Sequence, residues 1–160
     1  YRLPFEINET HIISQGYDGD FSHQGEKSID IPLDEGSPIY AMRGGRVVKL
    51  EERYSSGGVN KVFYDKANYV QILHDDNTWA TYVHLQKDGV DPLRGDKVEA
   101  GDLIGYSGNT GFSSGPHLHF SVSDLDQNLD IRTLETYFKT LGAQNGEILE
   151  EGKSYTAVEL

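Results

Sequence analysis

Two β-type runs joined by a short polar turn constrain the fold of this chain more than any other feature. Residues 68–74 alternate, with Val70 and Ile72 on one face and Tyr69, Gln71 and Leu73 on the other. Residues 78–85 are rich in β-branched and aromatic side chains, which is typical of a strand. Because only the polar residues 75–77 separate the runs, we expect them to pair as an antiparallel hairpin.

Further short apolar runs repeat this pattern along the chain. Segment 36–41, Gly-Ser-Pro-Ile-Tyr-Ala, resembles segment 95–100, Gly-Asp-Lys-Val-Glu-Ala, and each precedes another β run, at 46–48 and 103–106. This similarity suggests a duplicated β motif. The 18 Gly and 10 Tyr of the chain also favour short strands joined by tight turns.

One stretch, residues 131–140, has apolar side chains at helical spacing, so we expect one short helix near the C-terminus. The side chains with this spacing are Leu134, Tyr137, Phe138 and Leu141. The fold class expected is therefore mainly β, with antiparallel sheets, a duplicated β motif and this one short C-terminal helix. A length of 160 residues suits a single domain, residues 1–160, with a core of its own.

Charge and composition exclude several classes of function. The formal net charge is −12 and the sequence pI is about 4.8, so nucleic acid is not an expected partner. No run of about 18 apolar residues is present, so no membrane span is expected in this chain. There are no cysteines, so a metal site would have to use His and carboxylate ligands. The first residue is Tyr, which is compatible with processing from a longer product.

The histidines and one aspartate carry the chemistry. His117 and His119 are two apart in an expected strand, so both imidazoles project from one face. They could share a metal, or one could bind metal while the other faces a substrate. His84 ends the hairpin strand and His23 lies in a polar stretch. Asp30 sits among apolar residues, where a carboxylate without a partner would be costly.

Taken together in order, these residues resemble the lysostaphin-type zinc metallopeptidases, which cut peptidoglycan peptides. The resemblance covers roughly residues 15–122, and the combination of ordered motifs is more specific than any one of them. The matching text is His23, Ile29-Asp30-Ile31-Pro32, Gly36-Ser37-Pro38-Ile39-Tyr40-Ala41, Asn68-Tyr69-Val70-Gln71-Ile72-Leu73-His74, Tyr82-Val83-His84-Leu85, Gly105-Tyr106-Ser107-Gly108-Asn109-Thr110-Gly111 and Ser114-Gly115-Pro116-His117-Leu118-His119-Phe120.

The resemblance implies an open substrate groove over one sheet and one Zn²⁺ per chain. It implies that His23, Asp30 and His119 bind the metal and that His84 and His117 are catalytic, with their individual roles left open. Three protein ligands leave a fourth position for water, as in catalytic zinc sites. Such zinc lowers the pKa of its water to about 7, so that hydroxide can attack a peptide carbonyl.

One departure from the family pattern concerns the first two ligands. The family places the aspartate four residues after the histidine, whereas His23 and Asp30 are seven apart. An odd separation on a regular strand would direct them to opposite faces, so residues 24–28 are expected to loop out or bulge, helped by Gly25. Glu26 is the rival carboxylate. Asp30 is preferred because Ile31-Pro32 and Gly36 follow it in the family manner.

Other polar residues carry weaker signals. Tyr17, near His23, and Asn68, at the start of a strand, are candidate substrate-binding residues. His74 is expected to be structural or solvent-facing, and His11 has no motif around it.

The function expected from the resemblance is hydrolysis of peptide cross-links in bacterial peptidoglycan, in the periplasm or outside the cell. The alternatives are a secreted peptidase that degrades Gly-rich protein and a non-catalytic activator of a partner cell-wall hydrolase. A lipoyl-type carrier domain is a further alternative, and it would need a modifiable lysine at an exposed hairpin tip. Lys97 instead lies inside a repeat, and all five expected zinc and catalytic positions are filled, which disfavours the two non-catalytic alternatives.

Overall fold

The structure, a computed structural model, describes residues 1–160 and is built almost entirely from short β-strands, nine of which form one sheet. It contains no helix long and apolar enough to cross a membrane. The elements are β1 (Thr10–Ile12), β2 (Ser28–Pro32), β3 (Pro38–Tyr40), β4 (Gly45–Glu51), β5 (Gly57–Gly58), a 3₁₀ helix (Lys61–Phe63), β6 (Asn68–Leu73), β7 (Trp79–Val90), β8 (Lys97–Val98), β9 (Leu103–Ser107), β10 (Gly111–Phe112), β11 (His117–Leu125), β12 (Ile131–Thr133) and β13 (Ser154–Thr156).

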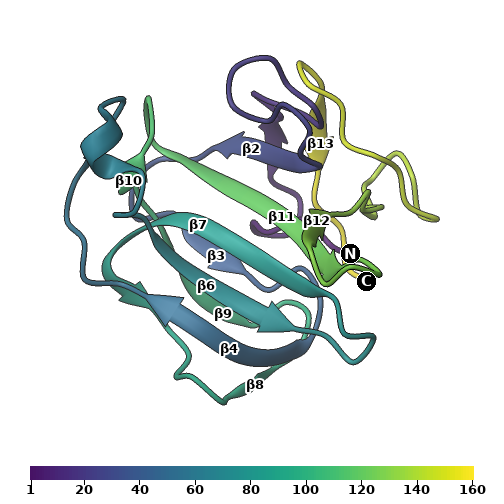
Figure 1. Ribbon diagram of the computed structural model, residues 1–160. Helices are drawn as coiled ribbons and strands as arrows, with labels where there is room; N and C mark the ends of the chain where they lie inside the picture. The colour runs from purple at the N-terminus through teal and green to yellow at the C-terminus, as the bar shows by residue number, and fades with distance from the viewer.

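The expected hairpin is confirmed as β6 and β7 at the centre of the sheet. The main path of the sheet runs β12–β11–β7–β6–β4–β8, and β2 pairs with β11 on the edge opposite β7 (Figure 1). The turn closes with a hydrogen bond of 2.8 Å from the His74 amide to the Thr78 carbonyl. Val70 and Ile72 are fully buried, as the alternation of residues 68–74 predicts.

The two similar segments occupy related places in the fold. Each begins at a glycine with positive φ, +86° at Gly36 and +100° at Gly95, a conformation that a side chain disfavours. The first strand of each copy pairs with the second strand of the other, so β3 pairs with β9 and β4 pairs with β8. The exchanged pairing supports the prediction of a duplicated β motif.

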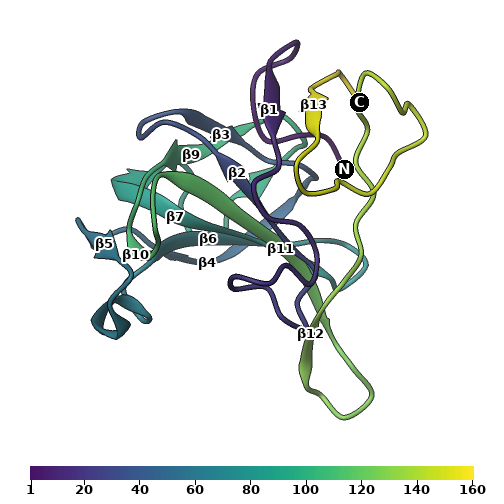
Figure 2. The same ribbon diagram turned by 90° about the horizontal axis from the view of Figure 1, so that it is seen from above.

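The core lies where the sheet folds over on itself, with β3 and β9 on the far side of β6 and β7 (Figures 1 and 2). Tyr82 on β7 is fully buried there, and its hydroxyl accepts a hydrogen bond of 2.8 Å from the Met42 amide. Ile39 and Ile104 pack from the other side. This rigid β framework supports the residues on the opposite, open face of β11.

The prediction of a C-terminal helix is wrong. Residues 131–133 instead form β12, which pairs antiparallel with β11, and the chain then continues without regular structure. Phe138 is buried, but Tyr137 and Leu141 are 57% and 66% exposed, so the spacing does not mark one apolar face. In place of helical hydrogen bonds, the Leu134 amide donates to the Val122 carbonyl on β11, and the backbone of Phe138 pairs with that of Glu147.

The two ends of the chain meet beside the main sheet. β1 and β13 form a separate antiparallel pair with Thr10 opposite Thr156, and both termini lie on this side (Figure 2). The C-terminal segment therefore packs against the N-terminal arm. It also brings Glu151 to Gly16, whose amide donates to the Glu151 carboxylate at 3.3 Å.

Candidate metal centre and active site

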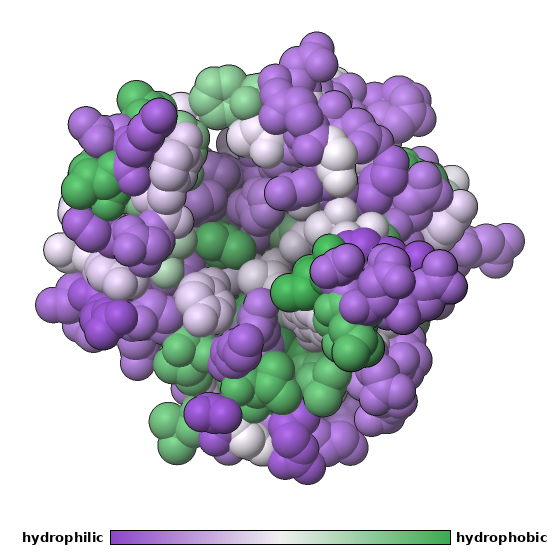
Figure 3. Space-filling view, in the orientation of Figure 1, coloured by the Kyte–Doolittle hydropathy of each residue, from purple (hydrophilic) through white to green (hydrophobic).

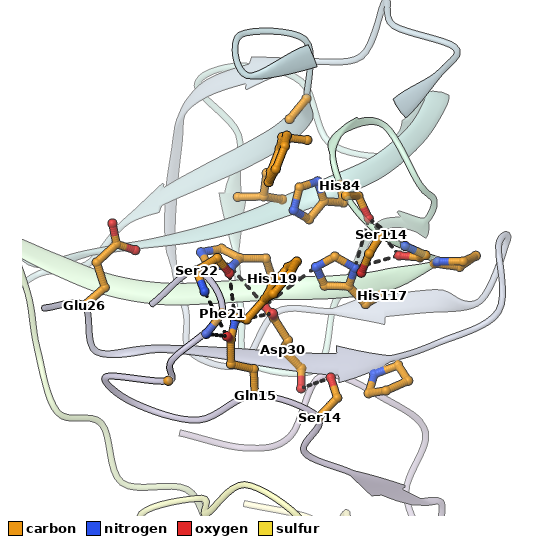
Figure 4. A pocket seen from close by; sticks show the side chains of 18 of the residues that line it. Ser14, Gln15, Phe21, Ser22, Glu26, Asp30, His84, Ser114, His117 and His119 are labelled. Carbon is orange, nitrogen blue, oxygen red and sulfur yellow. Dashed lines mark hydrogen bonds and ion pairs between the residues drawn. The ribbon is translucent and has the colours of Figure 1, made fainter. Parts of the chain in front are cut away.

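Strand β11 positions three of the predicted site residues through its register. It runs antiparallel to β2, with Asp30 directly opposite His119. Residues opposite each other in a ladder project from the same face, and His117, two residues from His119, shares that face. Ile29 and Ile31 are fully buried in the core, so Asp30 points the other way, toward the two histidines (Figure 4).

His23 reaches the same place from a loop and not from a strand. Its amide bonds to the Gly19 carbonyl, and the Glu26 amide bonds to the His23 carbonyl, which closes a turn over residues 24–25. Gly25 has a φ of +76° and is exposed, as expected for a loop that absorbs extra residues. Most of the extra residues therefore loop out before β2 begins at Ser28.

The side chains of His23, Asp30 and His119 converge as a metal-binding set, with one ligand atom from each all within 4.8 Å of one another. His119 Nδ1 is 2.9 Å from Asp30 Oδ1 and 3.2 Å from His23 Nε2, and His23 Nε2 is 3.3 Å from Asp30 Oδ1. His23 Nδ1–H donates to the Gly16 carbonyl at 3.0 Å, which leaves Nε2 with a lone pair facing the group. Two imidazoles and one carboxylate fit Zn²⁺.

The carboxylate at this centre is strongly stabilised in its charged form. Burial alone would raise the pKa of Asp30, but hydrogen bonds with His119 and His23, and the charges that His119 and His117 can carry, hold it well below its usual range. Conversely, burial would lower the pKa of His23, but Asp30 raises it overall. Asp30 is therefore a carboxylate, and His23 is a side chain that can carry a positive charge beside it. A bound divalent ion would take the place of that positive charge.

His84 is placed by a distortion of β7. Val83 pairs with Tyr69 and Leu85 with Asn68, so His84 is an extra, bulged residue. Its φ is +68°, in the left-handed region that glycine favours. Its Nδ1–H donates to the Thr110 carbonyl at 2.7 Å, which leaves Nε2 unprotonated, and burial together with the nearby charge of His117 lowers its pKa to about 4.

His117 lies beside His84, with ring centroids 4.5 Å apart. Its Nδ1–H donates to the Gly115 carbonyl at 2.8 Å, so its Nε2 is also free. That Nε2 is 3.7 Å from Asp30 Oδ1. The two histidines predicted to be catalytic therefore stand next to the metal-binding set and are not bound into it.

Asp30, His84, His117 and His119 line a cleft of about 910 Å³, and His23 lies buried behind it. Figure 3 shows it as a hollow with a largely hydrophilic floor between the lobe that carries β10 and the lobe that carries the N-terminal loops. Aromatic side chains stand on both sides of the hollow. Phe21 is 69% exposed on one wall, and Tyr64 packs against Phe112 on the other, with ring centroids 4.5 Å apart and the rings tilted by 46°.

The two predicted substrate-binding residues lie elsewhere and do not line this cleft. The Tyr17 hydroxyl accepts from the Thr136 amide at 2.8 Å and donates to the Thr136 carbonyl at 3.1 Å. Asn68 is fully buried, and its amide bonds to the Tyr54 backbone and to the Leu85 carbonyl, next to His84.

The remaining histidines and the rival carboxylate also lie apart from the metal-binding set. Glu26 is exposed at the edge of the cleft, pointing away from the centre (Figure 4). His74 is buried with its Nδ1–H bonded to the Gly44 carbonyl, in keeping with a structural role. His11 packs against Phe5.

The sequence did not assign a role to two residues at the site. Gln15 is buried and bonds to Asp30 Oδ2 at 3.0 Å, although it sits in an irregular arm with no motif. Thr110 holds His84 through its carbonyl, and its hydroxyl donates to the Leu85 carbonyl at 2.7 Å. Thr110 lies in a Gly-rich motif that the sequence does show, so its position, though not its role, was visible.

A comparison with protein families bears on this site directly. The profile of Peptidase family M23 matches residues 24–131, about two thirds of the chain. The match begins directly after His23 and includes Asp30, His84, His117 and His119.

The chain belongs to peptidase family M23.

Named relatives are consistent with this membership. The chain is 34% identical over 124 residues to the peptidoglycan DD-endopeptidase ShyA of Vibrio cholerae, an alignment that covers 74% of this chain and 26% of the relative. It is 36% identical over 95 residues to the glycyl-glycine endopeptidase ALE-1 of Staphylococcus capitis, covering 58% and 23%. In both cases the chain spans about a quarter of the relative's length.

Solved structures of the family share the fold. Lysostaphin from Staphylococcus simulans superposes with a TM-score of 0.58 at 25% identity, over 83% of this chain and 51% of that one. The catalytic domain of the prophage-encoded M23 protein EnpA from Enterococcus faecalis gives a TM-score of 0.59 at 23% identity, over 82% and 93%. The mainly β, antiparallel fold expected from the sequence is thus that of the family.

Proposed function

We propose that this M23 domain is a zinc-dependent endopeptidase that hydrolyses peptide cross-links of bacterial peptidoglycan, in the periplasm or outside the cell. The observation that carries the proposal is the convergence of His23, Asp30 and His119 beside the free Nε2 atoms of His84 and His117. A metal-binding set next to two imidazoles with free Nε2 atoms suits metal-assisted hydrolysis.

Zn²⁺ held by the three ligands would supply a water of lowered pKa and would polarise the peptide carbonyl. The side chains of His84 and His117 would orient the water and the substrate by hydrogen bonds. His84 is neutral around pH 7 because its pKa is lowered to about 4, so its Nε2 accepts a hydrogen bond and can orient the attacking water. His117 has 14% of its side chain exposed, and its free Nε2 can accept a hydrogen bond from the water or the substrate.

The shape of the cleft supports a peptide substrate. An open trough between Phe21 and the Tyr64–Phe112 pair gives room for an extended chain on both sides of the reacting bond. The relatives named above are a DD-endopeptidase and a glycyl-glycine endopeptidase. We therefore propose D-amino-acid or glycine-containing cross-links as substrates, with Gly-rich protein as the alternative.

The test is digestion of purified peptidoglycan and of a pentaglycine peptide by the zinc-loaded protein, with mass spectrometry of the released fragments. Close to one Zn²⁺ per chain and loss of activity on chelation are expected. His117→Ala should retain zinc but lose turnover by about 10²–10⁴-fold, whereas the matched control His11→Ala should behave as wild type. A protein that binds no zinc, or that leaves both substrates intact, would contradict the proposal.

A further inference from the structure

Gln15 has a side-chain amide whose hydrogen-bonding capacity is fully used beside the metal-binding set. Its side chain is buried, with 6% of the residue exposed. Nε2 donates to Asp30 Oδ2 at 3.0 Å and to Ser22 Oγ at 2.8 Å. Oε1 accepts from the backbone amides of Phe21 and Ser22 at 3.1 and 3.0 Å (Figure 4). Two donors and two acceptors are therefore all engaged.

These four bonds join two parts of the chain that must meet for a metal to bind. One partner is Asp30 on β2. The others lie in the segment directly before His23, so the amide holds the loop that presents this histidine. The backbone of Gln15 also pairs with Asp30, since the Asp30 amide bonds to the Gln15 carbonyl at 2.9 Å.

The packing around Gln15 leaves its side chain little freedom. A Cβ added at Gly19 would lie 2.5 Å from Gln15 Cγ, so the loop closes tightly over the amide. Asp30 Oδ2 is occupied by Gln15, which leaves Oδ1 as the oxygen facing His23 and His119. The direction of the carboxylate is thereby fixed.

We propose that Gln15 is a positioning residue that sets the metal affinity of the site by fixing Asp30 and the loop of His23 relative to each other. The proposal rests on the proposed function for the identity of the metal. Because His23 and Asp30 are separated by a loop and not held on one strand, an added tie between them is needed. Removal of a partner that orients a metal ligand typically costs 10–100-fold in affinity.

The test is zinc affinity, by competition with a chelator, for the full chain and Gln15→Met, which keeps the volume and removes all four bonds. We expect a 10–100-fold weaker affinity and an altered absorption spectrum of the Co²⁺-loaded protein. Gln71→Met is the matched control, because its amide bonds to Thr81 Oγ1 on the sheet, away from the cleft, and it should leave both readouts unchanged.

A merely structural role would lower the melting temperature of Gln15→Met without changing the metal affinity or the Co²⁺ spectrum of the folded protein, and that result would overturn the proposal. If Gln15→Met does not fold, Ser22→Ala removes only one of the four bonds and should weaken zinc binding several-fold, while wild-type affinity in Ser22→Ala would overturn it instead. Both readouts are independent of peptidoglycan cleavage, so failure of the proposed substrate would leave this result unaffected.

Discussion

The backbone at His84 gives a prediction that separates catalysis from stability. His84 is a bulged residue with a φ of +68°, a position that usually selects glycine. A non-glycine residue held there costs of the order of 1–3 kcal/mol, a cost typical of functional sites. We therefore compare His84→Ala, which keeps a Cβ at this conformation, with His84→Gly, which does not.

Both variants lose the same side-chain interactions, so the difference between their melting temperatures reports the cost of the backbone conformation at residue 84. Each removes the imidazole and its 2.7 Å bond to the Thr110 carbonyl, worth about 1 kcal/mol net. Alanine at positive φ is less stable than glycine by about 1 kcal/mol after the entropy of the unfolded chain is counted. For a domain of this size, 1 kcal/mol corresponds to about 2–4 °C in melting temperature. His84→Gly should therefore melt that much higher than His84→Ala.

The assay is thermal denaturation of both variants alongside peptidoglycan hydrolysis. Turnover should fall by about 10²–10⁴-fold in both, because each lacks the imidazole. Thr81 on the same strand is the control, where Thr81→Gly should be less stable than Thr81→Ala by about 0.5–1 kcal/mol, since glycine weakens an ordinary strand. If His84→Gly melts below His84→Ala, the backbone at this position is not strained, and if either variant keeps its turnover, His84 is not catalytic.

Three further predictions follow from the same geometry. Asp30→Ala should abolish zinc binding while Glu26→Ala changes the affinity little, measured by chelator competition; the reverse order would reassign the carboxylate ligand. Tyr17→Phe should lower the free energy of unfolding by about 1–3 kcal/mol, because it leaves the Thr136 amide without its acceptor, and should leave the rate of cleavage unchanged. Unchanged stability with slower cleavage would instead make Tyr17 a substrate contact. Burial lowers the pKa of His74, so the stability that the neutral His74 side chain contributes is present above about pH 6.5 and is lost as pH falls below that value. The melting temperature of wild type should therefore exceed that of His74→Gln by less at pH 5 than at pH 7. A larger difference at pH 5 would refute this.

The sequence predicted the strands well where alternation and turn residues agreed. The β6–β7 hairpin has buried Val70 and Ile72 on one face and a polar turn at its end, and both signals are local. The prediction of a C-terminal helix was wrong because the spacing of apolar residues alone does not show which side chains are buried. Residues 131–133 pair with β11, and this non-local contact outweighs the local pattern.

The candidate site was predictable to a similar extent. The alternation of β11 places His117 and His119 on one face, and Asp30 among isoleucines points to a partner outside the core. The orientation of His23 could not be derived, because the loop of residues 24–27 between it and β2 has no geometry fixed by the sequence pattern. Nor could the engagement of Tyr17 with Thr136, since the partner lies 119 residues away along the chain.

Backbone carbonyls determine how the imidazoles are presented, and this links the Gly-rich motifs to the chemistry. His23, His84 and His117 each donate Nδ1–H to a carbonyl, and so each directs an unprotonated Nε2 into the site. The acceptors are Gly16, Thr110, which precedes Gly111, and Gly115. At Gly111, with a φ of +83°, an added Cβ would lie 2.5 Å from the Ala67 Cβ. A side chain there would displace the neighbouring Thr110 carbonyl that orients His84, so the glycine supports the tautomer that leaves the His84 Nε2 unprotonated.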